Sequence, residues 1–142
     1  MTTLAVIGLG TMGLGIAQTY AAAGFDVLAT DAVPAARDSA QARLRDGLLP
    51  RVQAGKLTEG AMEALLGRIT VVPDPGAMGA ATLAIEAVVE KIGVKRGLFA
   101  ALETVMAPDA VLATNTSSLS VAAMAQGLAR PERLLGLHFF NP

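Results

Sequence analysis

The 142-residue chain has no cysteine, no tryptophan and a single histidine, His138. The lack of cysteine excludes disulfide bonds, thiol catalysis and Cys-ligated metal sites, and we expect no metal centre. Aromatic residues make up only 4% of the chain, although 53% of it is hydrophobic. Alanine and aliphatic side chains must therefore form the core.

The chain also lacks an excess of charge of either sign, because its formal net charge is only −1. It contains no basic run that is interleaved with aromatic residues. This balance gives no electrostatic basis for binding nucleic acid or an anionic membrane. The opening residues, MTTLAVIGLG, contain neither a basic segment nor a long apolar stretch. No signal peptide or transmembrane helix is indicated, and we expect a cytoplasmic protein.

Short apolar runs alternate with helical patterns along the whole chain. The runs predict strands at residues 4–7, 27–30, 69–72, 83–85, 111–114 and 134–139. The helical patterns cover residues 12–23, 34–53, 58–66, 94–105 and 119–125, with Thr58 as a cap. This alternation predicts one α/β domain over residues 1–142, with a mostly parallel sheet covered by helices on both faces.

A glycine-rich turn follows the first predicted strand and opens the first predicted helix. Its sequence, GLGTMG, fits G-x-G-x-x-G, and Asp31 ends the next strand 21 residues after Gly10. Gly8 allows the tight turn, Gly10 lets the backbone approach a pyrophosphate, and Gly13 lets the helix pack on the strand. The pattern predicts a Rossmann-type, doubly wound dinucleotide-binding fold; the alternative is a turn without a ligand. The candidate cofactor-binding residues here are Gly8, Leu9, Gly10, Thr11, Met12 and Gly13.

Asp31 indicates which dinucleotide binds. Its carboxylate can accept hydrogen bonds from the ribose hydroxyls and would repel a 2′-phosphate. Ala32 and Val33 follow it, so no arginine stands directly behind to receive that phosphate. We therefore expect NAD and not NADP. The alternative role is a cap for the helix that starts at Pro34.

Three later stretches identify a family. They are EAVVEK at residues 86–91, followed by Lys95; NTSSL at residues 115–119; and HFFNP at residues 138–142. With GLGTMG, in this order and spacing, they resemble the NAD-binding domain of the 3-hydroxyacyl-CoA dehydrogenases over the whole chain. The glycine turn alone also fits the 3-hydroxyisobutyrate dehydrogenase group, which does not carry HFFNP.

The resemblance implies oxidation of an L-3-hydroxyacyl-CoA to the 3-ketoacyl-CoA, with NAD as cofactor, in fatty acid β-oxidation or related acyl-CoA metabolism. In the family, the residue matching His138 is the catalytic base, which suits a side chain that exchanges protons near neutral pH. The residue matching Ser117 binds the substrate's 3-oxygen. Either Ser117 or Ser118 could instead cap the helix predicted from Leu119, and Ser118 fits that role better.

Four further residues take cofactor roles by the same resemblance. Asn115 is implied to lie near the nicotinamide ribose, and Asn141 near the carboxamide unless it only forms the Asn-Pro turn. Glu90 is implied to lie beside the nicotinamide, and Lys95 near the phosphates of the cofactor or of CoA. The alternative for Glu90 and Lys95 is a solvated, charged helix start.

The family's chains continue beyond HFFNP. They supply a glutamate that orients the histidine, and an all-helical C-terminal domain that closes the cleft and forms a homodimer. This sequence ends at Pro142. We therefore expect a cofactor domain truncated before that helical domain and nearly inactive alone. Alternatives are a dehydrogenase of 3-hydroxyadipyl-CoA or of a 3-hydroxy acid, and a non-catalytic, crystallin-like NAD-binding protein.

Overall fold

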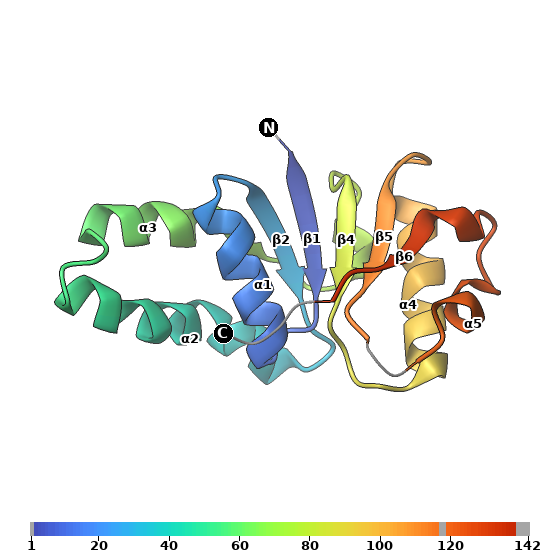
Figure 1. The fold of residues 1–142 in the computed structure, drawn as a ribbon, viewed down its shortest axis with the longest axis horizontal. Helices are drawn as coiled ribbons and strands as arrows, with labels where there is room; N and C mark the ends of the chain where they lie inside the picture. Colours follow the sequence, from blue (N-terminus) through green and yellow to red (C-terminus); the bar gives the residue numbers. More distant parts are fainter. Residues whose placement is uncertain (1, 117–118, 139–142) are drawn as a thin grey trace.

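The computed structural model describes residues 2–116 and 119–138. Its six strands form one parallel sheet in the order β3-β2-β1-β4-β5-β6 (Figure 1). This order confirms the expected Rossmann-type fold, and it reverses direction beside β1, where such sheets bind their ligands. The strands are β1 (Thr3–Ile7), β2 (Asp26–Thr30), β3 (Ile69–Val71), β4 (Leu83–Glu86), β5 (Val111–Thr114) and β6 (Leu134–Gly136).

Helices cover both faces of this sheet. One layer contains the first three helices and the other contains the last two (Figure 1). None of the helices in the described ranges is long and apolar enough to cross a membrane. The helices are α1 (Thr11–Ala22), α2 (Pro34–Gln53), α3 (Glu59–Gly67), α4 (Ile92–Val105) and α5 (Val121–Ala125), with 3-10 turns η1 (Pro75–Ala77) and η2 (Pro131–Arg133).

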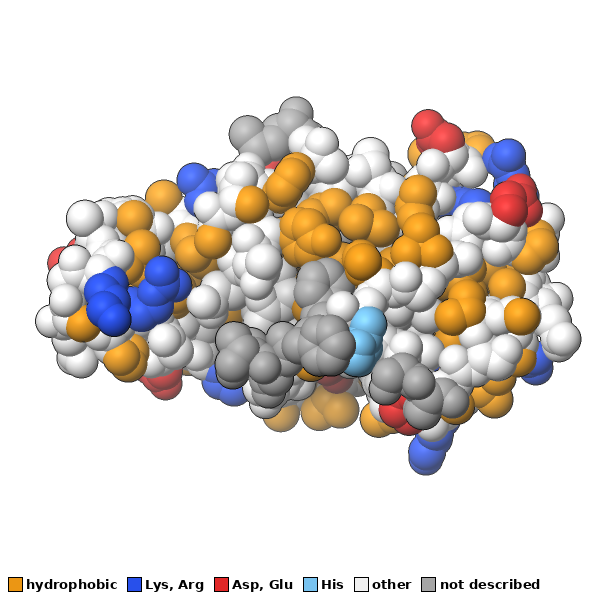
Figure 2. All heavy atoms as spheres, in the orientation of Figure 1, with side chains coloured by type: hydrophobic (Ala, Val, Ile, Leu, Met, Phe, Trp, Pro, Cys, Tyr) orange, Lys and Arg blue, Asp and Glu red, His pale blue; other side chains and the backbone are white. Residues whose placement is uncertain are grey.

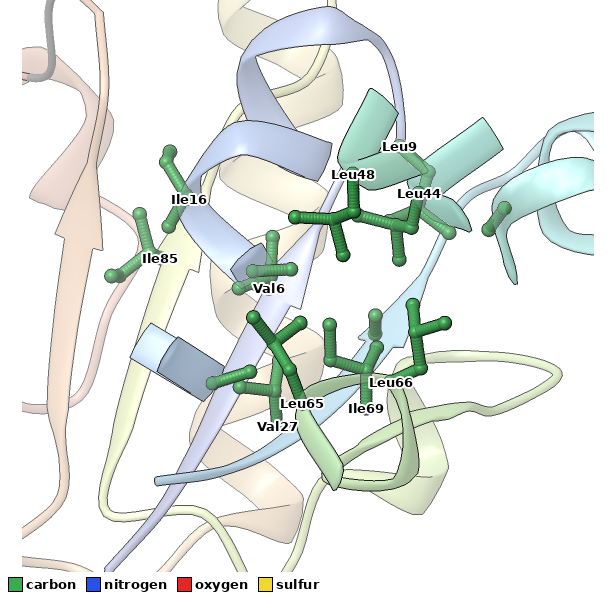
Figure 3. Packing of buried hydrophobic residues seen from close by; sticks show 14 of the residues in the cluster. Val6, Leu9, Ile16, Val27, Leu44, Leu48, Leu65, Leu66, Ile69 and Ile85 are labelled. Atoms are coloured by element: carbon green, nitrogen blue, oxygen red, sulfur yellow. The ribbon is translucent and has the colours of Figure 1, made fainter. Parts of the chain in front are cut away.

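Strand β1 shows why the core has two halves. Val6 packs into the cluster formed with α1, α2 and α3, as Figure 3 shows, whereas Ala5 and Ile7 pack against α4 and α5. Successive side chains of a strand point to opposite faces. All three residues are buried, so a strand covered on both sides must be apolar throughout, as the sequence predicted.

Two helix starts test the predicted caps. The cap at Thr58 is confirmed, because its hydroxyl accepts the amide of Ala61 at 3.0 Å. The cap of the last helix was placed wrongly at Ser118, which lies outside the described residues, because α5 begins only at Val121 and Ser120 caps it, accepting the amide of Ala123 at 3.1 Å.

The end of the predicted strand at residues 134–139 also differs. Strand β6 ends at Gly136, and Leu137 still donates its amide to the carbonyl of Thr114 at 2.9 Å. Phe139 lies outside the described residues. The pairing with β5 therefore reaches beyond the strand to Leu137, the residue before His138.

Candidate functional site

The candidate site lies along the carboxyl edge of the sheet. All strands are parallel, so the segments that follow them meet at this edge. The structure brings there the Gly8 turn after β1, Asp31 after β2, Glu90 after β4, Asn115 after β5 and His138 after β6. The predicted site residues Ser117 and Asn141 lie outside the described residues.

Two glycines of the turn are required by close packing. Gly8 has φ +106°, and a Cβ there would lie 2.3 Å from the carbonyl oxygen of Ala87. A Cβ on Gly13 would lie 1.6 Å from the carbonyl oxygen of Gly8. Both distances are far inside van der Waals contact, so only glycine allows the turn to sit against β4 and α1 to sit against the turn.

The start of α1 is open to an anion. The helix begins at Thr11, and its N-cap residue, Gly10, supplies no side-chain cap. The first N–H groups of a helix have no partner within it and lie at the positive end of its dipole. A Cβ on Gly10 would meet no atom within 4 Å, so the backbone here is accessible. The first turn of α1 therefore offers the phosphate site that the sequence predicts.

Leu9 contributes to the turn through its backbone alone. Its side chain is 1% exposed and packs in the core, as Figure 3 shows. Its amide donates to Asp31 Oδ2 at 2.7 Å. The predicted cofactor role of Leu9 is thus confined to its peptide groups.

Asp31 connects the end of β2 to the glycine turn. Besides the amide of Leu9, its carboxylate accepts the amide of Val33 at 2.8 Å through Oδ1. Val33 is the N-cap residue of α2, and no side chain caps that helix. The alternative role of Asp31 as the helix cap is therefore wrong. Two backbone amides fix its carboxylate, and the lone pairs that remain are available to ribose hydroxyls.

The glycine turn and Asp31 together line a hollow of about 620 Å³, and we call it the Gly-turn hollow. Its volume falls within the ordinary range of small-molecule sites. Its polar side chains are Asp31, Ser39 and Arg43, and valines after β2 and β4 give it an apolar wall. An apolar wall beside the carboxylate of Asp31 suits an adenosine. The wall valines are Val33, Val88, Val89 and Val94.

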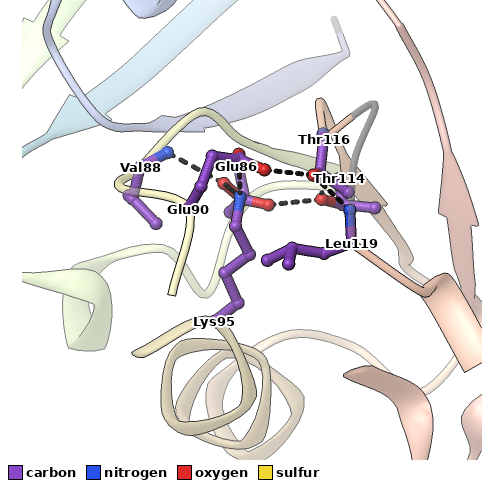
Figure 4. Close-up of polar contacts among 7 residues, drawn as sticks. All are labelled: Glu86, Val88, Glu90, Lys95, Thr114, Thr116 and Leu119. Atoms are coloured by element: carbon purple, nitrogen blue, oxygen red, sulfur yellow. Dashed lines mark hydrogen bonds and ion pairs between the residues drawn. The ribbon is translucent and has the colours of Figure 1, made fainter. Parts of the chain in front are cut away.

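Glu86 ends β4 with a fully buried carboxylate (Figure 4). It accepts the ammonium of Lys95 at 2.6 Å, the amide of Val88 at 2.8 Å and the hydroxyl of Thr114. Buried charges need such partners, and this carboxylate has one cation and two neutral donors. Glu86 was given no role of its own from the sequence, because a residue at the end of a buried strand shows no sign there of its partners on other elements.

Lys95 is not the exposed residue of a solvated helix start. Its side chain is 0% exposed, and its ammonium also lies 3.0 Å from Glu90 Oε1. The solvated alternative is therefore wrong for Lys95, because two carboxylates compensate its charge inside the protein. The contact of Lys95 with a phosphate of the cofactor or of CoA stays a prediction.

Glu90 remains half exposed and is held from two sides. Lys95 binds one of its oxygens, and the hydroxyl of Thr116 donates to the other (Figure 4). The Thr116 hydroxyl also accepts the amide of Leu119 at 3.1 Å. The Glu90 carboxylate is thus fixed at the sheet edge between the segments that follow β4 and β5. Thr116 was also overlooked, although hydroxyls at the carboxyl ends of parallel strands are a usable signal.

Asn115 and His138 lie on neighbouring segments. Asn115 is half-buried, and its backbone amide donates to the backbone carbonyl of Glu86 at 2.9 Å. His138 is exposed and directly follows Leu137, which is still bonded to Thr114 of β5; Figure 2 shows the histidine at the surface. The described ranges contain no group of three or more His, Cys, Asp or Glu side chains that could hold a metal ion.

Known proteins match the chain from end to end. The model of the family "3-hydroxyacyl-CoA dehydrogenase, NAD binding domain" matches residues 3–142. A 3-hydroxyadipyl-CoA dehydrogenase of Escherichia coli is 48% identical over 99% of this chain and 30% of its own length. A 3-hydroxybutyryl-CoA dehydrogenase of Mycobacterium tuberculosis is 43% identical over 96% of this chain and 48% of its own length.

Solved structures agree with the sequence matches. The crystal structure of an Escherichia coli 3-hydroxybutyryl-CoA dehydrogenase superposes with a TM-score of 0.94 at 47% identity, over 99% of this chain and 30% of that one. The chain therefore spans half or less of the length of the relatives described here. Its glycine turn, its strand order and the match over residues 3–142 together show that it belongs to the family of NAD-binding domains of the 3-hydroxyacyl-CoA dehydrogenases.

Proposed function

We propose that this chain carries the NAD site and part of the active site of an enzyme that oxidises an L-3-hydroxyacyl-CoA to the 3-ketoacyl-CoA. The observation that carries the proposal is the sheet edge, where one line of segments presents the glycine turn, Asp31, Glu90 and His138. Such a line suits a cofactor that extends from an adenosine site at β2 to a reacting ring near β5 and β6.

The reaction removes a hydride from C3 and a proton from the 3-hydroxyl group, leaving a C=O bond. NAD, when bound, accepts the hydride. His138 takes the proton, because an exposed imidazole at this edge can act as a base near neutral pH. Ser117 binds the 3-oxygen by the same proposal, and Asn115 and Asn141 position the cofactor.

The substrate class rests on the relatives' printed names, which are 3-hydroxyadipyl-CoA and 3-hydroxybutyryl-CoA dehydrogenase. We propose a short 3-hydroxyacyl-CoA, used in fatty acid β-oxidation or related acyl-CoA metabolism. A cytoplasmic homodimer belongs to the same proposal and rests on the family resemblance alone.

The test is His138→Gln in the full protein, assayed with acetoacetyl-CoA and NADH. We expect the turnover number to fall by about 10²–10⁴-fold with little change in NADH affinity, because the histidine that takes the proton in oxidation must return it to the 3-oxygen in this reverse reaction, and it acts in the same transition state. Arg45→Gln is the matched control, since Arg45 is exposed and pairs with Glu63 of α3 away from the site. A parallel loss of NADH binding would assign His138 to structure, and no turnover by the unaltered protein would refute the proposal.

A further inference from the structure

The charged side chains that line the Gly-turn hollow have opposite signs. Among the described residues that line it, Asp31 is the only acid and Arg43 the only base. Arg43 lies in the third turn of α2, well past the segment directly behind Asp31 in which an NADP-binding arginine was sought. The course of α2 brings the Arg43 side chain to the Gly-turn hollow.

Arg43 spans from α2 to the glycine turn. Its Nη1 donates to the carbonyl of Leu9 at 2.8 Å, its Nη2 to the carbonyl of Ala36 at 2.9 Å, and its Nε to the hydroxyl of Ser39 at 3.0 Å. All three acceptors are neutral, and no ion pair of Arg43 occurs within the described part of the chain. A guanidinium has five N–H donors, so the cation is held in place with donors left to bind an anion.

Asp31 and Arg43 act on the same peptide segment. Asp31 accepts the amide of Leu9, while Arg43 donates to the carbonyl of Leu9. The two side chains thus contact the same part of the glycine turn, and both line the Gly-turn hollow. A ribose whose hydroxyls reach Asp31 would place a 2′-phosphate within this one hollow, where the carboxylate repels it and the guanidinium attracts it.

Arg37 is a weaker candidate for such a phosphate. It donates to the backbone carbonyl of Asp31 at 2.8 Å and lines a neighbouring hollow. Asp31 and Asp74 both line that neighbouring hollow, so it contains two acids beside one base. The Gly-turn hollow contains no such second acid among its described lining residues.

We propose that the guanidinium of Arg43, held in place by Ser39, forms a latent site for the 2′-phosphate of NADP, and that the Asp31 carboxylate alone keeps this site closed. The inference rests on the proposed function, because it concerns the selectivity of the same cofactor site. Removing one negative charge should therefore reverse or largely abolish the preference for NAD, with no arginine added.

The experiment compares the dissociation constants of NADH and NADPH by fluorescence titration. In Asp31→Asn, which keeps the side chain's shape and one acceptor oxygen, we expect the ratio of the NADPH to the NADH constant to fall by about 10- to 100-fold, the worth of one charge-assisted interaction. Adding Arg43→Gln to Asp31→Asn should raise this ratio most of the way back to its value in the unaltered protein. Adding Arg45→Gln, an arginine of the same helix outside the hollow, should not.

Other outcomes overturn the inference. An unchanged ratio in Asp31→Asn would contradict the proposed site. The phosphate would also lie elsewhere if the gain in NADPH affinity persisted after Arg43→Gln was added but disappeared with Arg37→Gln. If Asp31→Asn does not fold, Arg43→Gln in the otherwise unaltered protein must still weaken NADPH binding several-fold more than NADH binding. Equal weakening would mean that Arg43 only supports the turn. Failure of the unaltered protein to bind NADH would refute the proposed function instead.

Discussion

At the residue scale, Gly13 is a position at which the structure has no room for even one methyl group. Gly13→Ala would place a Cβ 1.6 Å from the carbonyl oxygen of Gly8, and backbone cannot yield as a flexible side chain does. We expect α1 to move off the glycine turn, with a loss of stability of about 1–3 kcal/mol and a large loss of NADH affinity. Urea denaturation and NADH titration measure both effects.

Gly15 provides the matched control in the same helix. A Cβ there would meet no atom within 4 Å, and alanine favours a helix over glycine by up to about 1 kcal/mol. Gly15→Ala should therefore keep NADH affinity and hold or raise stability. Equal damage from both substitutions would contradict the packing argument for Gly13.

Individual residues differed in how well the sequence predicted them. Gly8, Gly13 and Asp31 were predictable because their roles follow from local spacing around one turn. Lys95 was not, because its burial depends on Glu86 of another element, and a lysine beside charged neighbours normally indicates solvent. Arg43 was missed for a similar reason, since only the course of α2 returns it to the turn.

At the scale of elements, the Glu86–Lys95 ion pair joins β4 to α4. Both side chains are 0% exposed. Glu86→Gln leaves the ammonium with only the half-exposed Glu90 as a counter-charge, and breaking a buried pair costs about 3–5 kcal/mol. We expect a loss of this size in urea denaturation.

A double-mutant cycle checks the cause. Combining Glu86→Gln with Lys95→Met removes both charges, so the combined loss should be smaller than the sum of the two single losses. Additive losses would mean that the two side chains stabilise β4 and α4 independently.

The elements themselves were largely predictable. Apolar runs marked β1, β2 and β5 because strands buried on both faces admit few polar residues. The start of α5 was not predictable, because several serines compete for the cap. The hydroxyl of Thr116 binds the amide of Leu119, and Ser120 is left to start the helix at Val121.

At the scale of the whole molecule, strand order sets local stability. β1 lies inside the sheet with a partner on each side, whereas β3 and β6 are edges of three residues each. Amide hydrogens of β1 should therefore exchange the slowest and those of β6 among the fastest of the sheet. Hydrogen–deuterium exchange followed by mass spectrometry measures this, and protection of β6 equal to that of β1 would contradict it.

The overall architecture was predictable only in part. Alternating strands and helices predicted a parallel sheet between two helical layers, but their periodicity contains no information on which strands are neighbours. The doubly wound, Rossmann-type fold was predicted from the glycine fingerprint and the family resemblance, and the observed sheet confirms it.

Gly8 and Ala87 are far apart in the chain, yet the turn at Gly8 rests on the carbonyl of Ala87. The turn can reach its final shape only after β4 has joined β1, and contacts between such distant segments are slow to form. We therefore expect the cofactor site to be completed late in folding. NADH should then lengthen the lifetime of the native state without hastening its formation.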